Sequence, residues 1–297
     1  MPARARVLWA TPFRFLTTLT VFGVTIASVA ALAAALFLTH PAHVAVGPPP
    51  PEFRAEAVAI PSPSGALLRG WFVTGRAGGG AVVLMHGIRS NRLSMVRRAK
   101  LLNDAGFSAL LFDFQAHGES IGQHMSFGAL EALDARAAVA FLRARLSAER
   151  IGAIGASLGG AAMLLGPGPL QVDALVIEAV YPDIGAALEN RVRIFVGPLA
   201  RPISYLLEHL LTPLTGVRAA ELRPIDRIGA VVAPIFVASG TLDNRTTIAE
   251  ARTLFERAPE PKLFWAVEGA RHIDLEAFAP VEYRQRVLPF LLERLQR

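Results

Sequence analysis

The sequence predicts an α/β fold in which a mostly parallel central sheet is flanked by helices. Short apolar runs, each bounded by turn residues, alternate along the chain with longer helical patterns. Continuous apolar runs of this length are typical of strands buried on both faces of a sheet, and strand–helix alternation is typical of parallel sheets. The predicted strands of this kind are 81–85, 109–112, 151–154, 175–179, 234–238 and 262–267.

The amino-acid composition excludes several classes of protein and of functional site. The 297 residues are 53% hydrophobic and include no cysteine, which excludes a disulfide scaffold, a thiolate metal site and a cysteine nucleophile. The formal net charge of +6 suggests a membrane surface or nucleic acid as a partner. Because the arginines are scattered rather than clustered, we expect no nucleic-acid binding.

The first 39 residues predict a membrane anchor. No charged residue lies within 15–39, which is long enough as a helix to cross a bilayer, so we predict a transmembrane signal-anchor helix there. Arg4, Arg6 and Arg14 make 1–14 basic, and the positive-inside rule then predicts a cytoplasmic N-terminus and an extracytoplasmic catalytic domain. A cleaved signal peptide and a buried core helix are the alternatives.

Residues 40–52 predict a proline-rich linker between this helix and a globular domain at 53–297. Four consecutive prolines from Pro48 to Pro51 favour an extended, stiff spacer that holds the domain away from the bilayer. The domain begins with a predicted antiparallel hairpin of strands 55–60 and 67–73.

Helical patterns fill the spaces between the predicted strands. They cover 93–105, 128–146, 158–165, 248–257 and 281–296. One section, from about 183 to 224, has no clear strand and contains helical stretches such as 203–211, so we predict an inserted helical cap over one end of the sheet.

A candidate nucleophile lies between a predicted strand and a predicted helix. Gly155-Ala156-Ser157-Leu158-Gly159 matches G-x-S-x-G in the structural context that this motif requires. The turn is tight, so the flanking Gly155 and Gly159 must be small, and the hydroxyl of Ser157 is placed at a helix N-terminus.

A serine nucleophile needs a base, and the base needs a carboxylate that orients it. Asp243 and His272 each follow the carboxyl end of a predicted strand, where open α/β sheets place their sites, and the order serine, acid, histidine fits. Five other carboxylates are alternatives for the acid: Glu178, Asp183, Asp226, Glu268 and Asp274.

Backbone N–H groups are expected to stabilise the negative charge that develops on the substrate oxygen. One donor is the residue after the nucleophile, Leu158, and the other is Ile88 in the loop after strand 81–85. Gly87 is expected to permit a close approach of the backbone, and His86 is expected to brace this loop by hydrogen bonds.

These motifs resemble the α/β-hydrolase superfamily and, within it, serine hydrolases of the BEM46-like or serine aminopeptidase group. The matching segments are LMHG at 84–87, DFQAHGES at 113–120, GASLGG at 155–160, GTLD at 240–243 and GARH at 269–272. The second departs from the family pattern D-x-R-G-x-G-x-S, because Gln115 and Ala116 replace the arginine and the glycine, which removes a fixed positive charge below the site.

The resemblance implies a Ser157–His272–Asp243 triad that forms an acyl-enzyme, with no metal and no organic cofactor. The apolar cap and the anchor favour a small-molecule or lipid-like acyl substrate, an ester or thioester. A serine peptidase or aminopeptidase is the nearest alternative. An alternative of another class is a catalytically idle, membrane-tethered binding protein.

Overall fold

A computed structural model of the chain describes residues 10–51 and 53–296, with side chains from residue 15 onward. The predicted basic residues Arg4 and Arg6, and the side chain of Arg14, lie outside the described residues.

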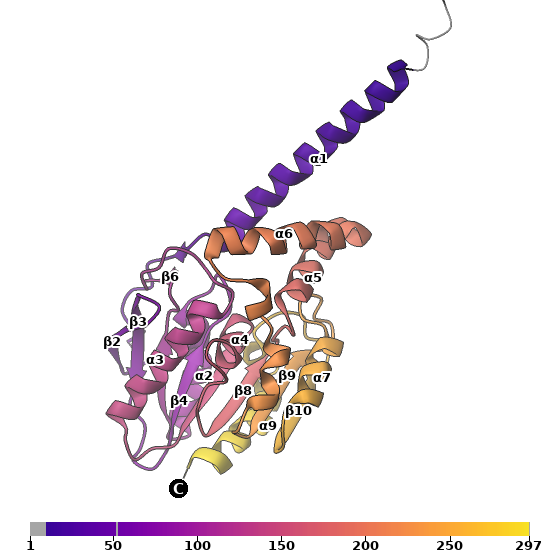
Figure 1. The fold of residues 1–297 in the computed structure, drawn as a ribbon. Helices are drawn as coiled ribbons and strands as arrows, with labels where there is room; N and C mark the ends of the chain where they lie inside the picture. Colours follow the sequence, from indigo (N-terminus) through magenta and orange to yellow (C-terminus); the bar gives the residue numbers. More distant parts are fainter. Residues whose placement is uncertain (1–9, 52, 297) are drawn as a thin grey trace, which may run out of the picture.

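The core of the molecule is an eight-stranded sheet with the strand order β10-β9-β8-β7-β4-β5-β3-β2 (Figure 1). The hairpin strand β3 pairs antiparallel with both β2 and β5, and every other pairing is parallel. The predicted α/β fold with a mostly parallel sheet is therefore confirmed. The strands are β2 Ala55–Pro61, β3 Leu67–Val73, β4 Ala81–Met85, β5 Ser108–Phe112, β7 Ile151–Ala156, β8 Ala174–Glu178, β9 Ile235–Gly240 and β10 Lys262–Val267.

Helices cover both faces of the sheet. In β4 the side chains of Val82 and Leu84 belong to one apolar cluster, and those of Val83 and Met85 belong to the other, as the two-residue period of a strand requires. The first cluster includes residues of α2 Val96–Asp104 and α9 Pro280–Leu295. The second includes residues of α3 Ala129–Arg145, α4 Leu158–Leu164 and α7 Ile248–Arg257.

The predicted cap section is helical. It contains α5 Ile184–Val196, which is capped at its N-terminus by the Asp183 carboxylate, and α6 Ala200–Thr215, which packs against α5. Figure 1 shows α6 lying crosswise at the end of the domain from which α1 projects.

Helix α1, Ala10–Thr39, contains a run from Phe15 to Thr39 that is long and apolar enough to cross a membrane. Most of its side chains are exposed, but Ala31 and Ala35 are buried where α1 packs against α6. The C-terminal end of α1 is thus attached to the cap, and the rest of the helix extends away from the domain (Figure 1).

The prolines predict an extended, stiff spacer, and in the structure part of the linker is hydrogen-bonded to the domain. Strand β1, Ala42–His43, pairs with β6, His117–Gly118, and the N–H groups of Val46 and Gly47 donate to Glu119 at 3.0 and 2.9 Å. Phe53 is buried in the core. The prolines stiffen the segment, but these hydrogen bonds fix where it lies.

Candidate active site

Ser157 occupies the sharp turn between β7 and α4. Its backbone has φ 51° and ψ −110°, a conformation that L-residues adopt at a cost of about 1–3 kcal/mol, and its N–H donates to the Glu178 carbonyl at 2.7 Å. A Cβ on Gly155 would lie 2.5 Å from the Gly159 carbonyl carbon, and one on Gly159 would lie 2.4 Å from the Met85 carbonyl oxygen. Both positions therefore require glycine, as the G-x-S-x-G pattern predicts.

Asp243 and His272 come together from neighbouring loops at the carboxyl ends of β9 and β10. The Nδ1 of His272 lies 2.8 Å from Oδ2 of Asp243, whose side chain is fully buried. The other oxygen, Oδ1, accepts from the N–H groups of Arg245 at 2.8 Å and Thr246 at 2.9 Å. The two loops are also joined to each other, because the Gly269 N–H donates to Thr241 Oγ1 at 2.9 Å.

The five alternative carboxylates for the acid either have other partners or lie away from His272. Glu178 and Asp274 both form ion pairs with Arg98, at 2.6 and 2.8 Å. The remaining alternatives lie outside this cluster: Asp183 caps α5, Asp226 is paired with Arg223, and Glu268 is exposed. Among the described residues, Asp243 is therefore the carboxylate that orients His272.

The two expected oxyanion-hole residues line one cavity beside Ser157. Leu158 is the first residue of α4, where an N–H group has no acceptor within its own helix, and Ile88 follows the carboxyl end of β4. A Cβ on Gly87 would make ordinary contacts at 3.7 Å with Ala156 and Ser157, so packing within the protein does not require a glycine here. That Gly87 permits a close backbone approach stays a prediction.

His86 braces the loop that carries Gly87 and Ile88, as expected. Its Nε2 accepts from the Phe114 N–H at 3.1 Å, so its Nδ1 carries the proton and donates to the Gly87 carbonyl at 2.8 Å. Burial, with the neighbouring His117 as a smaller cause, lowers the pKa of His86 to about 3. This imidazole therefore remains neutral and holds the loop, rather than acting as a base.

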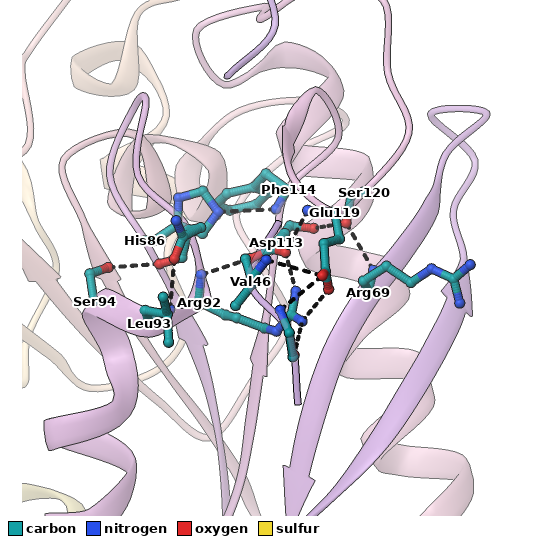
Figure 2. A network of polar contacts seen from close by, with 12 residues as sticks. Val46, Arg69, His86, Arg92, Leu93, Ser94, Asp113, Phe114, Glu119 and Ser120 are labelled. Atoms are coloured by element: carbon teal, nitrogen blue, oxygen red, sulfur yellow. Dashed lines mark hydrogen bonds and ion pairs between the residues drawn. The ribbon is translucent and has the colours of Figure 1, made fainter. Parts of the chain in front are cut away.

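An ionic network centred on the buried Arg92 and Asp113 lies near His86, as Figure 2 shows. The Arg92 guanidinium forms ion pairs with the buried Asp113 and with Glu119, which also binds the linker. Ser120 Oγ donates to the Asp113 carbonyl at 2.6 Å and accepts from the Arg69 N–H at 2.8 Å. Arg92 is not predicted from the sequence, because no local feature marks it as the partner of Asp113.

Gln115 occupies the position of the arginine in the family pattern and forms hydrogen bonds there with a side chain that carries no charge. Its amide nitrogen donates to Glu131 Oε1 at 2.9 Å and to the His124 carbonyl at 2.8 Å. Within residues 10–51 and 53–296, no group of three or more histidines and carboxylates is arranged to hold a metal ion.

Two arms of a cavity meet at Ser157 and His272. The larger arm, about 370 Å³, has a mostly apolar surface but includes the charged side chains of Arg98, Glu178 and Asp274, and we call it the polar arm for these three residues. The smaller arm, about 80 Å³, is largely apolar and includes Leu38 from the end of α1 and Leu188 from α5. The sequence alone predicts no place for the end of α1 in this cavity. The residues shared by both arms are Ile88, Arg89, Ser157, Arg191, Arg245 and His272.

Arg98 is the hub of the polar arm and is almost fully buried. It pairs with Glu178, which also accepts from the Tyr283 hydroxyl at 2.6 Å, and with Asp274, which is two residues after His272. Three elements are thereby fixed around the His272 loop: α2, the end of β8 and α9. The surrounding carboxylates, with Glu178 foremost, raise the pKa of Arg98 despite its burial.

Comparisons with known proteins agree with this architecture. A model described as the alpha/beta hydrolase family matches residues 82–293, which include Ser157, Asp243 and His272. The uncharacterized protein YqkD of Bacillus subtilis is 25% identical over 244 residues, which cover 81% of this chain and 80% of YqkD.

Two solved structures share the fold. The esterase Pf2001 of Pyrococcus furiosus superposes with a TM-score of 0.71 and 22% identity, covering 88% of this chain and 99% of the esterase. An esterase of Exiguobacterium antarcticum superposes with a TM-score of 0.59 and 13% identity, covering 80% of this chain and 99% of the esterase. The finer likeness to the serine aminopeptidase or BEM46-like group stays a prediction. From the match of the family model across most of the domain, the chain belongs to the alpha/beta hydrolase family.

Proposed function

We propose that this protein is a serine hydrolase that cleaves a carboxylic ester or thioester through an acyl-enzyme. The observation that carries the proposal is the 2.8 Å bond between His272 Nδ1 and the buried Asp243 carboxylate, in a cavity that Ser157 also lines. The esterases with the same fold support the choice of an ester.

In this proposal Ser157 Oγ attacks the substrate carbonyl carbon while its proton passes to His272 Nε2. The carbonyl electron pair moves to oxygen, and the N–H groups of Ile88 and Leu158 stabilise the resulting charge; losing one such donor costs about 3–4 kcal/mol in the transition state. The C–O or C–S bond then breaks, and the departing alcohol or thiol takes the proton from His272. Water, activated by the same base, releases the acid.

The charges around the cavity favour an esterase over an aminopeptidase. An aminopeptidase needs a carboxylate free to bind the amino terminus of its substrate. Both carboxylates of the polar arm, Glu178 and Asp274, already form ion pairs with Arg98 and are held by it. We therefore rank the peptidase as the second candidate and the idle binding protein as the third.

For localisation we propose that α1 is an uncleaved anchor, with the N-terminus in the cytoplasm and the domain outside. The apolar side chains of α1 are largely exposed, which is costly in water and favourable in lipid. Arg89 donates to the Phe37 carbonyl at 2.9 Å, and Leu38 lines the cavity, so the end of α1 has a role in the domain. A mature chain that begins at His40 or later would overturn this part.

The proposed reaction is tested with the full-length chain in nonionic detergent. We expect hydrolysis of p-nitrophenyl esters and no cleavage of aminoacyl p-nitroanilides, with both activities measured against the Ser157→Ala variant. Cleavage of the anilides without turnover of any ester would favour the peptidase. Absence of both activities, in a protein that is folded by circular dichroism, would favour the binding protein.

A further inference from the structure

The two arms of the active-site cavity meet at a cluster of positive charge. Three of the six residues shared by both arms are arginines, and each comes from a different element: Arg89 from the loop after β4, Arg191 from α5 and Arg245 from the loop after β9. Ser157 and His272 line the same junction. A group bound by these arginines would therefore lie close to the scissile bond.

The carboxylates of the cavity are too few to neutralise its arginines, because two carboxylates and four arginines line the two arms together. Glu178 and Asp274 are the acidic residues that line the polar arm, and both are paired with the buried Arg98. In the part of the chain that the structure describes, the guanidinium groups of Arg191 and Arg245 have no ion pair with a carboxylate. Arg89 is held differently, by the Phe37 carbonyl and the Phe37 ring.

Arg191 and Arg245 also repel each other. Arg191 is half-buried, and its burial, followed by the charge of Arg245, lowers the pKa of its guanidinium. Two cations that converge without a counter-ion destabilise the empty site, and an anion placed between them relieves both the repulsion and the desolvation. The planar fork of a guanidinium matches the oxygen geometry of a carboxylate or a phosphate.

We propose that Arg191 and Arg245 bind an anionic group of the substrate, a carboxylate or a phosphate, next to the reacting ester. This inference rests on the proposed hydrolase function and narrows its substrate class. The apolar arm, lined by Leu38 and Leu188 among others, takes the acyl chain. The anionic group then belongs to the alcohol part of the ester, which occupies the polar arm.

The test compares two substrates that differ by one charge. These are 4-butyryloxybenzoate, whose leaving group carries a carboxylate, and its neutral methyl ester. With the full-length chain in nonionic detergent, we expect the anionic ester to have a kcat/KM about tenfold or more above that of the neutral ester. The preference should decrease as sodium chloride is added, because salt screens the exposed Arg245.

Variants of Arg191 and Arg245 test whether these two residues cause the preference for the anionic ester. Arg245→Gln changes an exposed side chain and is expected to fold, and Arg191→Gln/Arg245→Gln removes both charges. We expect each to lower the anionic-to-neutral ratio, the double variant by about tenfold or more and chiefly through KM. Arg201→Gln on α6 is the matched control, because Arg201 is exposed and lines neither arm. An unchanged ratio in the double variant would overturn the inference.

A binding measurement separates failure of this inference from failure of the proposed function. Calorimetry with phenyl phosphate, in the Ser157→Ala variant, needs no turnover. Binding that is lost when Arg191 and Arg245 are replaced supports the anion site, even if no ester is hydrolysed. Equal binding with and without the two arginines, or no binding in either, contradicts it.

Discussion

Replacing Asp243 by asparagine removes the negative charge behind His272 while keeping the shape of the side chain. In the native site one carboxylate oxygen accepts from the N–H groups of Arg245 and Thr246, at 2.8 and 2.9 Å, and the other faces His272 Nδ1 at 2.8 Å. An amide has one oxygen and one NH₂ group. Its oxygen must stay with the two backbone donors, so its NH₂ must face His272.

That arrangement forces the imidazole into the wrong tautomer. His272 Nδ1 becomes the acceptor, the ring proton moves to Nε2, and no lone pair remains there to take the proton of Ser157. The corresponding substitution in a serine-protease triad lowers kcat about 10⁴-fold, equivalent to about 5 kcal/mol of barrier. The free energy of unfolding should fall by only about 1–3 kcal/mol, because each hydrogen bond keeps a partner.

The assay is hydrolysis of p-nitrophenyl butyrate by the full-length Asp243→Asn variant, with thermal unfolding followed in parallel. Asp226→Asn is the matched control, because Asp226 lies in an exposed ion pair with Arg223 away from the triad. We expect wild-type rates from the control. A folded Asp243→Asn enzyme that keeps more than a tenth of the wild-type rate would refute the role assigned to Asp243.

Three further predictions concern stability. The pKa of His86 is lowered to about 3 in the folded protein, so this histidine takes up a proton more readily in the unfolded chain. As pH falls from 6.5 to 3, the free energy of unfolding of the wild type should therefore decrease by up to about 5 kcal/mol, as measured by chemical denaturation. The His86→Asn variant should lack this decrease. Gly159→Ala places a Cβ 2.4 Å from the Met85 carbonyl oxygen and should cost more than about 2 kcal/mol, measured by thermal unfolding. Glu119→Ala removes the acceptor of two linker N–H groups and of Arg92, so limited proteolysis should cut residues 40–52 faster.

Each of these predictions has its own control. The pKa of the buried Asp134 is raised to about 6, but Asp134 is present in both the wild type and His86→Asn, so its effect cancels when their free energies of unfolding are subtracted. If these free energies changed in parallel with pH, the role of His86 would be contradicted. A Cβ at position 229 makes only an ordinary 3.6 Å contact, so Gly229→Ala should leave the thermal stability almost unchanged. An equal loss of stability in Gly159→Ala and Gly229→Ala would contradict the steric argument for Gly159. Glu56→Ala removes a carboxylate from an exposed ion pair, and equal cleavage in both glutamate variants would argue against the linker contact.

The parts of the fold that sequence predicts well are those with a local physical signature. The buried strand 81–85 is apolar throughout, and Ser157 is flanked by glycines that the turn requires. Asp243 and His272 follow the ends of adjacent parallel strands, and such strands bring their carboxyl ends to one edge. Fold class and candidate triad therefore follow from pattern and topology.

The remaining features depend on contacts between distant segments and have no local pattern. Arg92 lies 21 residues before Asp113, and nothing around it distinguishes it from a surface arginine. The two-residue strand β1 is too short to show periodicity, so the docking of the linker was not predictable. The same holds for the meeting of Arg191 and Arg245, because it depends on how the cap lies over the sheet.

The central claim is that Ser157 is a nucleophile activated by His272. It is tested most directly by treating the full-length protein with a fluorophosphonate and locating the adduct by mass spectrometry. We predict one phosphonyl group, on the peptide that carries Ser157, and slow or absent labelling in the His272→Ala variant. No adduct on folded wild-type protein, or an adduct on another residue that persists in Ser157→Ala, would contradict the claim.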